Sequence, residues 1–275
     1  MPELPEVETT RRGLDAVISG HQLKAIRVHH HQFRWPVPAN LNETLQGYTL
    51  QACLRRGKYL LLQFEHGVLI IHLGMSGSIR RVAPGEFLLK HDHVEFIFDN
   101  AEFRLNDPRR FGAVLWHPAK TGNIQSHTLL ANLGIEPFDP QFTAAYLHQM
   151  LQNRQSAIKT VLLSGDIVVG VGNIYASESL FRARINPKTA AGSISLARCK
   201  RLHQAILQTL NAALESGGST LKDYTGTNGE VGAYFEIHAA VYDKAGLPCK
   251  VCATPITKII QGQRATYYCP KCQRY

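Results

Sequence analysis

The sequence lacks the features of several common protein classes. In 275 residues no uninterrupted apolar run reaches the roughly 18 residues that a membrane span needs. No apolar leader follows the N-terminus, whose first residues include the acids Glu3 and Glu6. Internal repeats and low-complexity segments are also absent. We therefore expect a soluble, intracellular protein with packed cores, neither secreted nor bound to a membrane.

Acidic residues are scarce relative to basic ones. The chain has 30 Lys and Arg against 21 Asp and Glu, a formal net charge of +9. Residues 244–275 contain no acid at all and six basic residues, namely Lys244, Lys250, Lys258, Arg264, Lys271 and Arg274. Such a surplus favours a polyanionic partner, and nucleic acid before membrane.

Cysteine is rare until the C-terminal segment. Cys53 and Cys199 stand alone, and we expect ordinary buried thiols there. The other four form two Cys-x2-Cys pairs separated by sixteen residues, at Cys249, Cys252, Cys269 and Cys272. In a reducing compartment this spacing indicates one structural zinc ion on four thiolates, more than two disulfides or a redox pair. A zinc-bound hairpin without acids is suited to contacting a phosphate backbone.

The rest of the sequence predicts a β-rich half followed by a helical half. The first helix is expected over Glu3–Ile18. Strands are expected at Gln22–Arg34, Thr49–Phe64, Val68–His72, His93–Phe98, Glu102–Leu105 and Ala113–Trp116. Helices are expected at Ala144–Asn153, Ser177–Arg184 and Leu196–Ser216, and strands return from about Val241. The predicted fold class is α+β, with a β-sandwich domain at 1–125, a helical domain at 126–235 and a zinc finger at 236–275.

The N-terminal residues suggest covalent chemistry. If Met1 is removed, Pro2 presents a secondary amine close to Glu3 and Glu6. An α-amino group titrates far below a lysine, and a helix N-terminus disfavours its charged form further. A neutral amine of this kind attacks an aldehyde-like carbon and forms an iminium. The same residues are also typical of an ordinary helix start, so local chemistry alone does not decide.

Two glycine-flanked loops carry side chains that are unusual on a surface. His72–Gly77 contains Met75, and Asp107–Gly112 contains Arg109 and Phe111. Read alone, Met75 and Phe111 are typical of a core, but enzymes that flip a base out of a duplex need side chains to fill the gap. In the helical half, Gly170-x-Gly172 is too short for a nucleotide-binding motif. It is better suited to a tight turn that, with Asn173, opens a helix toward a phosphate.

The N-terminal sequence MPELPEVETTRRGL resembles the start of the bacterial formamidopyrimidine-DNA glycosylases. The resemblance covers essentially the whole chain. It includes residues 169–178, which match the family's helix–two-turn–helix signature, and the terminal zinc finger. It implies that DNA binds between an N-terminal β-sandwich and a helix–two-turn–helix domain. The segment Leu163–Asp166 departs from the family pattern, so the resemblance does not predict the geometry of that turn.

The resemblance also implies a catalytic set. Pro2 matches the Schiff-base nucleophile and Glu3 the proton donor, while Glu6 is expected to support the geometry of the site. Lys58 matches a lysine that reaches the sugar and phosphate of the lesion and is linked to proton transfer in β-elimination. Arg264 matches the finger arginine that contacts phosphates and is implicated in δ-elimination. Alone, a lysine or arginine in such a place is usually a solvated charge.

Further positions match DNA contacts of the family. Met75, Arg109 and Phe111 match a trio that fills the gap in the stack, with Arg109 facing the orphaned cytosine. The matched contacts to the DNA backbone are His91, Arg154, Lys159 and Asn173. The loop at 217–232 corresponds to one that closes over the extruded purine.

The predicted function is therefore a bifunctional DNA glycosylase and abasic-site lyase for oxidised purines. We expect a monomer that acts on double-stranded DNA with oxidised purines or abasic sites, in the cytoplasm at the nucleoid. One alternative is an endonuclease VIII-type glycosylase for oxidised pyrimidines, although those typically begin Pro-Glu-Gly-Pro, where this chain has Leu4. Another is a zinc protein that binds damaged DNA without catalysis. A proline-based tautomerase would leave the basic zinc hairpin unexplained.

Overall fold

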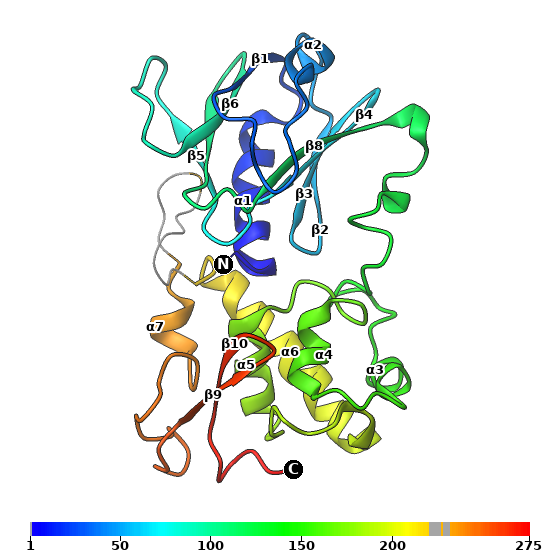
Figure 1. The fold of residues 1–275 in the computed structure, drawn as a ribbon, viewed down its shortest axis with the longest axis vertical. Coiled ribbons are helices and arrows are strands. Elements are labelled where there is room, and N and C mark those ends of the chain that lie inside the picture. Colours follow the sequence, from blue (N-terminus) through cyan, green and yellow to red (C-terminus); the bar gives the residue numbers. More distant parts are fainter. Residues whose placement is uncertain (1, 220–226, 228–231) are drawn as a thin grey trace. The chain divides into compact units, whose positions relative to one another are not determined.

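The computed structural model describes residues 2–219, 227 and 232–275 (Figure 1). Contacts divide the chain into two compact units. The first comprises Met1–Ala131 with Ser216–Ala233, and the second comprises Asn132–Glu215 with Tyr234–Tyr275. Among the described residues, no helix is both long enough and apolar enough to cross a membrane.

Helix α1, Leu4–Ile18, opens the first unit. Pro5 lies in its first turn, where the missing N–H costs nothing, and Glu6 places a carboxylate beside the positive end of the helix dipole. The helix ends where Ser19 becomes extended and its N–H bonds to the Asp15 carbonyl at 3.3 Å. This confirms the helix expected over Glu3–Ile18 to within a residue.

Two four-stranded antiparallel sheets form the sandwich of this unit. One has the order β2-β3-β4-β8, with strands Ala52–Arg56, Tyr59–Phe64, Gly67–His72 and Ala113–Pro118. The other has the order β1-β6-β7-β5, with strands Leu23–Val28, Asp92–Phe98, Glu102–Asn106 and Ser78–Val82. The β-sandwich predicted from the short, closely spaced strands is present.

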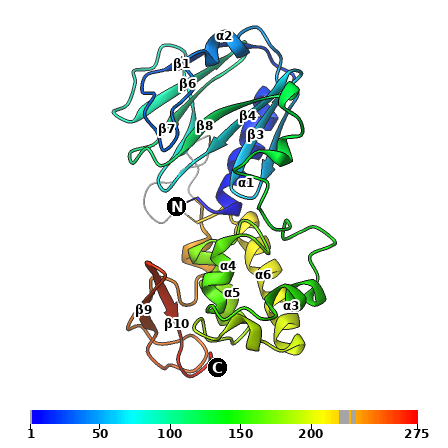
Figure 2. The ribbon, with the colours of Figure 1, turned by 45° about the vertical axis from the view of Figure 1, so that its right-hand side comes forward.

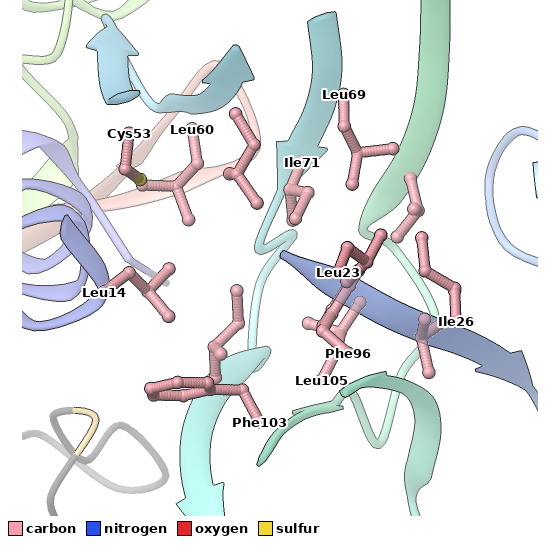
Figure 3. Packing of buried hydrophobic residues seen from close by; sticks show 14 of the residues in the cluster. Leu14, Leu23, Ile26, Cys53, Leu60, Leu69, Ile71, Phe96, Phe103 and Leu105 are labelled. Carbon is pink, nitrogen blue, oxygen red and sulfur yellow. The ribbon is translucent and has the colours of Figure 1, made fainter. Parts of the chain in front are cut away.

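The core of the first unit lies between the two sheets and beneath α1. Leu60 and Ile71 of one sheet share it with Leu23 and Phe96 of the other, and Leu14 reaches it from α1 (Figure 3). Each side chain of this kind, when fully buried, contributes roughly 1.5–3 kcal/mol. This core joins α1 to both sheets of the first unit.

Several predicted boundaries in the first unit were wrong. The strand expected over Gln22–Arg34 ends at Val28, and the one expected over 49–64 is divided by a two-residue turn at Gly57 and Lys58. Gly57 has φ +57°, which glycine adopts at little steric cost, so the chain reverses there although the flanking residues favour strand. Helix α2, Leu41–Leu45, and strand β5 were not predicted, because both are too short for a clear period.

The second unit contains five α-helices among its described residues, α3 Ala144–Leu151, α4 Ile158–Ser164, α5 Asn173–Arg182, α6 Leu196–Glu215 and α7 Tyr234–His238. Helix α6 packs against α3 and α5, and α4 packs against α5 (Figure 2). The helices expected at α3, α5 and α6 are present with shifted ends, whereas α4 was not predicted. Short 3-10 turns occupy Ala119–Thr121 and Ile124–Ser126 in the first unit and Ala191–Ser193 in the second.

Strands β9, Thr257–Gln261, and β10, Arg264–Tyr268, form the hairpin of the C-terminal segment. Gly262 and Gln263 both have positive φ, +53° and +61°, as the central residues of a type I′ turn require. The small core of the finger includes Phe181 of α5, so the hairpin is built onto the helical part of the same unit.

The contacts group the chain differently from the three domains expected at 1–125, 126–235 and 236–275. The finger belongs to the same unit as the helices, and Ser216–Ala233, expected in the helical domain, belongs to the first unit. The physical reason is that Ser219 and Thr227 contact α1 and β5, as described below. The exact domain limits remain a prediction.

Candidate functional site

The start of α1 carries a buried carboxylate pair behind Pro2. Pro2 is buried, and Glu3 and Glu6 are each only 1% exposed. The Glu3 N–H donates to Glu6 Oε2 at 2.8 Å. The other oxygen, Oε1, accepts from the N–H and the hydroxyl of Ser219, at 2.6 and 3.1 Å. Glu6 thus ties the start of the helix to the segment that follows α6 in sequence.

Gly218 allows this approach. A Cβ on this residue would lie 2.9 Å from Glu6 Oε1, and its φ of +88° is one that side chains rarely adopt. Gly217, with φ +70°, precedes it. The glycine pair therefore serves both to end α6 and to bring Ser219 onto Glu6.

Lys58 lies at the tip of the β2–β3 hairpin, and its charge acts on a histidine that was not among the predicted site residues. His72, the last residue of β4, pairs with Tyr59, and the two rings are 4.8 Å apart. Burial lowers the pKa of His72 to about 4, with further contributions from the charges of Lys58 and Arg34. The imidazole is therefore neutral near pH 7.

The protonation of His72 is also defined at the atomic level. Its Nδ1 lies 3.0 Å from the N–H of Gly74 and accepts that hydrogen bond, so the neutral ring carries its proton on Nε2. A neutral donor next to Lys58 is suited to binding an anionic group. In the sequence, His72 could have been noticed because it ends a predicted strand directly before a glycine-flanked loop.

The two loops with unusual surface residues meet. Asp107 is fully buried and accepts from the Gly112 N–H at 2.9 Å and from the Ser76 hydroxyl at 3.3 Å. Gly74 has φ +64°, and a Cβ there would lie 2.6 Å from the Gly112 nitrogen. One buried carboxylate and two glycines therefore hold the loops together.

These loops place Arg109 and Phe111 at the surface instead of in the core. Phe111 is 46% exposed, and the Arg109 guanidinium stacks over its ring at 4.7 Å from the centroid. Met75, on the other loop, is half-buried. His91 is also half-buried, and its carbonyl accepts from the N–H of Asp107 at 3.0 Å. The exposed Arg109–Phe111 pair excludes the interpretation of Phe111 as an ordinary core residue.

The four tail cysteines form a metal site. Their sulfur atoms all lie within 4.8 Å of one another, with separations of 3.5 Å for Cys252–Cys269 and 3.9 Å for Cys249–Cys272. A disulfide requires about 2.05 Å, whereas tetrahedral zinc with Zn–S bonds of about 2.3 Å places sulfurs about 3.8 Å apart. The residues therefore fit one zinc ion with four thiolate ligands.

Backbone groups support this donor set. The N–H of Val251 donates to Cys249 Sγ, and the N–H of Cys272 donates to Cys269 Sγ, each at 3.4 Å. Such bonds orient thiolates toward a metal. With four protein ligands the coordination of zinc is complete, so the site is structural. Arg264, the first residue of β10, is exposed beside the hairpin turn.

Lys159 joins α4, α5 and β10. It is 1% exposed, and its ammonium donates to Asn173 Oδ1, Thr266 Oγ1 and the Ala265 carbonyl at 2.6, 2.7 and 3.0 Å. Asn173 donates to the same carbonyl at 3.0 Å and to the Tyr242 hydroxyl at 3.3 Å. The predicted Lys159 and Asn173 are thus brought together, with Lys159 bonded inside the unit and Asn173 half-buried.

Arg154 is paired with an acid that departs from the family pattern. Its Nη1 lies 2.8 Å from Asp166 Oδ2. Helix α4 ends at Gly165 in the left-handed conformation, and Asp166 also accepts from the Ser164 hydroxyl at 2.5 Å. The structure thus gives the geometry of the turn at Leu163–Asp166, which the resemblance to the family did not predict.

Most of the loop at 217–232 lies outside the described residues, and so does Met1. Of the described part, the Thr227 carbonyl accepts from the Arg81 N–H at 2.8 Å. A Cβ on Gly13 would lie 2.0 Å from the Thr227 hydroxyl, so α1 receives Thr227 at a position where only glycine fits. The expected closure of this loop over a purine remains a prediction.

Comparison with known families identifies three matching segments. Residues 1–114 match the formamidopyrimidine-DNA glycosylase N-terminal domain, and residues 133–225 match the H2TH domain of the same enzymes. Residues 246–274 match a zinc finger found in FPG and IleRS. Formamidopyrimidine-DNA glycosylase of Bordetella petrii is 64% identical over 274 residues, covering 100% of both chains.

Solved structures agree over the full length. The chain is similar to a point mutant of Lactococcus lactis FPG in complex with DNA containing Fapy-dG, with a TM-score of 0.92, 32% identity and 100% of each chain covered. It is also similar to Lactococcus lactis Fpg in complex with DNA containing an abasic site, with a TM-score of 0.91 and 31% identity. That match covers 99% of this chain and 100% of the other.

Proposed function

Because the chain belongs to the formamidopyrimidine-DNA glycosylase family, we propose that it removes oxidised purines such as 8-oxoguanine and formamidopyrimidines from double-stranded DNA. It is a bifunctional base-excision enzyme, a DNA glycosylase and abasic-site lyase. The observation that carries the proposal is the buried Glu3–Glu6 arrangement directly behind Pro2, in a chain 64% identical over its length to a named member.

In the proposed mechanism, Met1 is removed and the Pro2 nitrogen attacks C1′ of the extruded nucleotide. The C1′–N bond to Pro2 forms as the glycosidic bond breaks, and Glu3 assists the proton transfer to the departing base. Pro2 then gives up its N–H proton, Glu3 assists protonation of the sugar oxygen O4′, and the C1′–O4′ bond breaks as the C1′=N bond of an iminium forms. The resulting iminium acidifies C2′. Loss of that proton expels the 3′ phosphate, with Lys58 assisting. Loss of the C4′ proton in a second elimination expels the 5′ phosphate, with Arg264 assisting. Water then releases the sugar fragment from Pro2.

The remaining site residues are proposed to hold DNA. Met75, Arg109 and Phe111 fill the space left by the extruded base, which fits the exposed Arg109–Phe111 stack. The proposed backbone contacts are His91, Arg154, Lys159 and Asn173. For Lys159, whose ammonium is bonded within the unit, contact with phosphate requires a change of partners, whereas Asn173 is half-buried at the start of α5.

The zinc ion has a structural role. When bound, it cross-links the segments around Cys249 and Cys269 and so holds the hairpin that carries Arg264. We propose further that the protein works as a monomer on DNA in the cytoplasm, at the nucleoid. The surplus of nine positive charges supports a nucleic-acid partner.

Borohydride trapping tests this proposal. The protein is incubated with a duplex containing 8-oxoguanine opposite cytosine, reduced, and the cross-linked peptide is mapped by mass spectrometry. We expect an adduct on the N-terminal proline. Specific binding of damaged DNA without an adduct, by protein whose free N-terminus is shown to be Pro2, would favour the non-catalytic alternative. Faster trapping on an oxidised pyrimidine than on 8-oxoguanine would favour the endonuclease VIII-type activity.

A further inference from the structure

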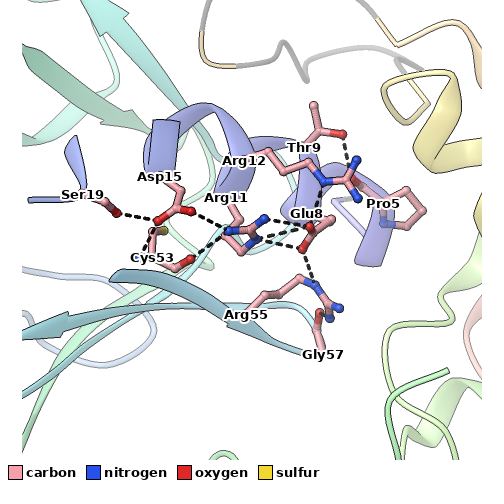
Figure 4. A network of polar contacts seen from close by, with 10 residues as sticks. All are labelled: Pro5, Glu8, Thr9, Arg11, Arg12, Asp15, Ser19, Cys53, Arg55 and Gly57. Atoms are coloured by element: carbon pink, nitrogen blue, oxygen red, sulfur yellow. Dashed lines mark hydrogen bonds and ion pairs between the residues drawn. The ribbon is translucent and has the colours of Figure 1, made fainter. Parts of the chain in front are cut away.

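Three arginines converge on one carboxylate of α1. Glu8 accepts from Arg11 at 3.1 Å, from Arg12 at 2.9 Å and from Arg55 of β2 at 3.0 Å (Figure 4). Its side chain is 13% exposed. Burial alone raises the pKa of Glu8, but the hydrogen bonds from the three arginines outweigh it, so the pKa lies below its ordinary value. The carboxylate is therefore charged in the neutral range.

Arg55 connects this carboxylate to the turn that carries Lys58. Its Nε donates to Glu8 Oε2 at 3.0 Å, while its Nη1 donates to the Gly57 carbonyl at 2.9 Å. That carbonyl belongs to the peptide bond between Gly57 and Lys58, so its direction determines where the Lys58 backbone points. Because a guanidinium is a rigid planar fork, these two hydrogen bonds together fix the orientation of the Arg55 head group.

We propose that Glu8 and Arg55 are positioning residues for Lys58. Through Arg55, helix α1, which begins beside Pro2, specifies the orientation of the hairpin tip. Neither residue touches the substrate in this proposal. The inference rests on the proposed function in one respect, namely that Lys58 assists β-elimination.

The charges indicate which contact depends most on Glu8. Without its carboxylate, three guanidinium groups face one another. Arg11 keeps Asp15 at 3.2 Å, and the Arg12 side chain is 59% exposed and can turn into water. The Arg55 side chain is 12% exposed, so it cannot leave as easily and is expected to shift, together with the Gly57 carbonyl.

The test separates the Pro2 step from the elimination step on a duplex with a preformed abasic site. For Glu8→Gln, we expect borohydride-trapped adduct to form within about 3-fold of the wild-type rate. Single-turnover strand cleavage should fall by about tenfold or more, because small displacements of a catalytic group cost rates of this order. Arg55→Lys, which keeps the charge without the fork, should give the same selective loss to a smaller extent.

Asp15→Asn is the matched control. Asp15 belongs to the same network, but it holds Arg11, Ser19 and the N–H of Cys53 at the other end of the helix. We expect this variant to lower thermal stability like Glu8→Gln and to leave the ratio of cleavage to trapping unchanged. Equal loss of trapping and cleavage in Glu8→Gln and Arg55→Lys would show a merely structural role and overturn the inference.

A double-mutant cycle with Lys58→Ala separates the positioning role of Glu8 from the proposed role of Lys58 in cleavage. If Glu8 acts through Lys58, adding Glu8→Gln to Lys58→Ala should slow cleavage by less than about 2-fold further. Fully additive losses would overturn the positioning role while leaving Lys58 in place. Wild-type cleavage by Lys58→Ala would instead remove Lys58 from the proposed function. If Glu8→Gln does not fold, Arg55→Lys in the same cycle gives the decision.

Discussion

The chain around the start of α1 and the chain of the zinc finger are held in place by two different kinds of interaction. At α1, the carboxylates of Glu6 and Glu8 bind backbone and guanidinium groups on a scaffold with a large apolar core. The finger has a small core, and four cysteines supply a metal site instead. A hairpin that buries little apolar surface needs a cross-link, whereas hydrogen bonds suffice where the scaffold is already rigid.

Removing zinc should break this comparison most strongly. Structural zinc contributes about 10–16 kcal/mol in isolated fingers, so chelation should unfold β9 and β10 and displace Arg264. We expect binding of a lesion-containing duplex to weaken on the order of 100-fold, as several phosphate contacts are lost. Hydrogen exchange should increase in residues 246–274 and remain slow in the sandwich. Loss of protection in the sandwich as well as in the finger would contradict the idea that the two regions are stabilised independently.

Cys199→Ala provides the control for this experiment. Cys199 is buried in α6 and lies outside the four-cysteine cluster. The variant should retain one zinc ion per chain, measured with a chromogenic chelator after thiol oxidation, and bind DNA like the wild type.

Gly218→Ala should have the next largest effect, because it disturbs the hydrogen bonds of the Glu6 carboxylate at the start of α1. The new Cβ meets Glu6 Oε1 at 2.9 Å and the φ of +88° is strained. We expect a loss of about 1–3 kcal/mol in the free energy of unfolding and about tenfold in base excision. Urea denaturation and single-turnover kinetics measure the two quantities.

Gly20→Ala isolates the backbone strain. Gly20 has φ +82°, and a Cβ there meets nothing within 4 Å. It should lose about 1–2 kcal/mol of stability with unchanged excision. Similar loss of excision in both variants would mean that the contact between Glu6 and Ser219 does not matter for the site.

The last effect concerns His72 and the dependence of stability on pH. The unfolded chain takes up a proton on His72 near its ordinary pKa of 6.5, while in the folded protein burial lowers the pKa to about 4. Between these values the unfolded state binds more protons, so stability falls as the pH drops, by at most about 1.4 kcal/mol per pH unit. His72→Gln should flatten this slope in urea denaturation between pH 4.5 and 7.

Lys58→Met sharpens the same measurement. Since the charge of Lys58 helps to lower the pKa of His72, its removal should raise that pKa and make the slope shallower. Parallel curves for the wild type and His72→Gln would contradict the assignment. The folded protein also lowers the pKa values of Glu8 and Asp15, whose ordinary values are 4.5 and 3.8. The stability that these two carboxylates contribute is fully present above the ordinary values. It is lost only as the pH falls below them toward the pKa values of the folded state.

Local patterns predicted the features that depend on neighbours in sequence. The acidic start of α1, the long amphipathic α6 and the Cys-x2-Cys pairs were all visible, because helix periodicity and metal-ligand spacing repeat over a few residues. Elements of five to seven residues, such as α2, β5 and α4, were missed because their form depends on packing against the rest of the unit.

By itself, the sequence determined the chemistry available to this protein: a proline at position 2 beside two carboxylates, four metal-binding thiolates and a surplus of positive charge. Only the tertiary structure decided how these groups are held. Glu8 and Arg55 are 47 residues apart in the chain yet bonded at 3.0 Å, and the ammonium of Lys159 meets β10 from 107 residues away. Contacts over such separations follow from strand register and helix packing, which no local pattern in the chain records.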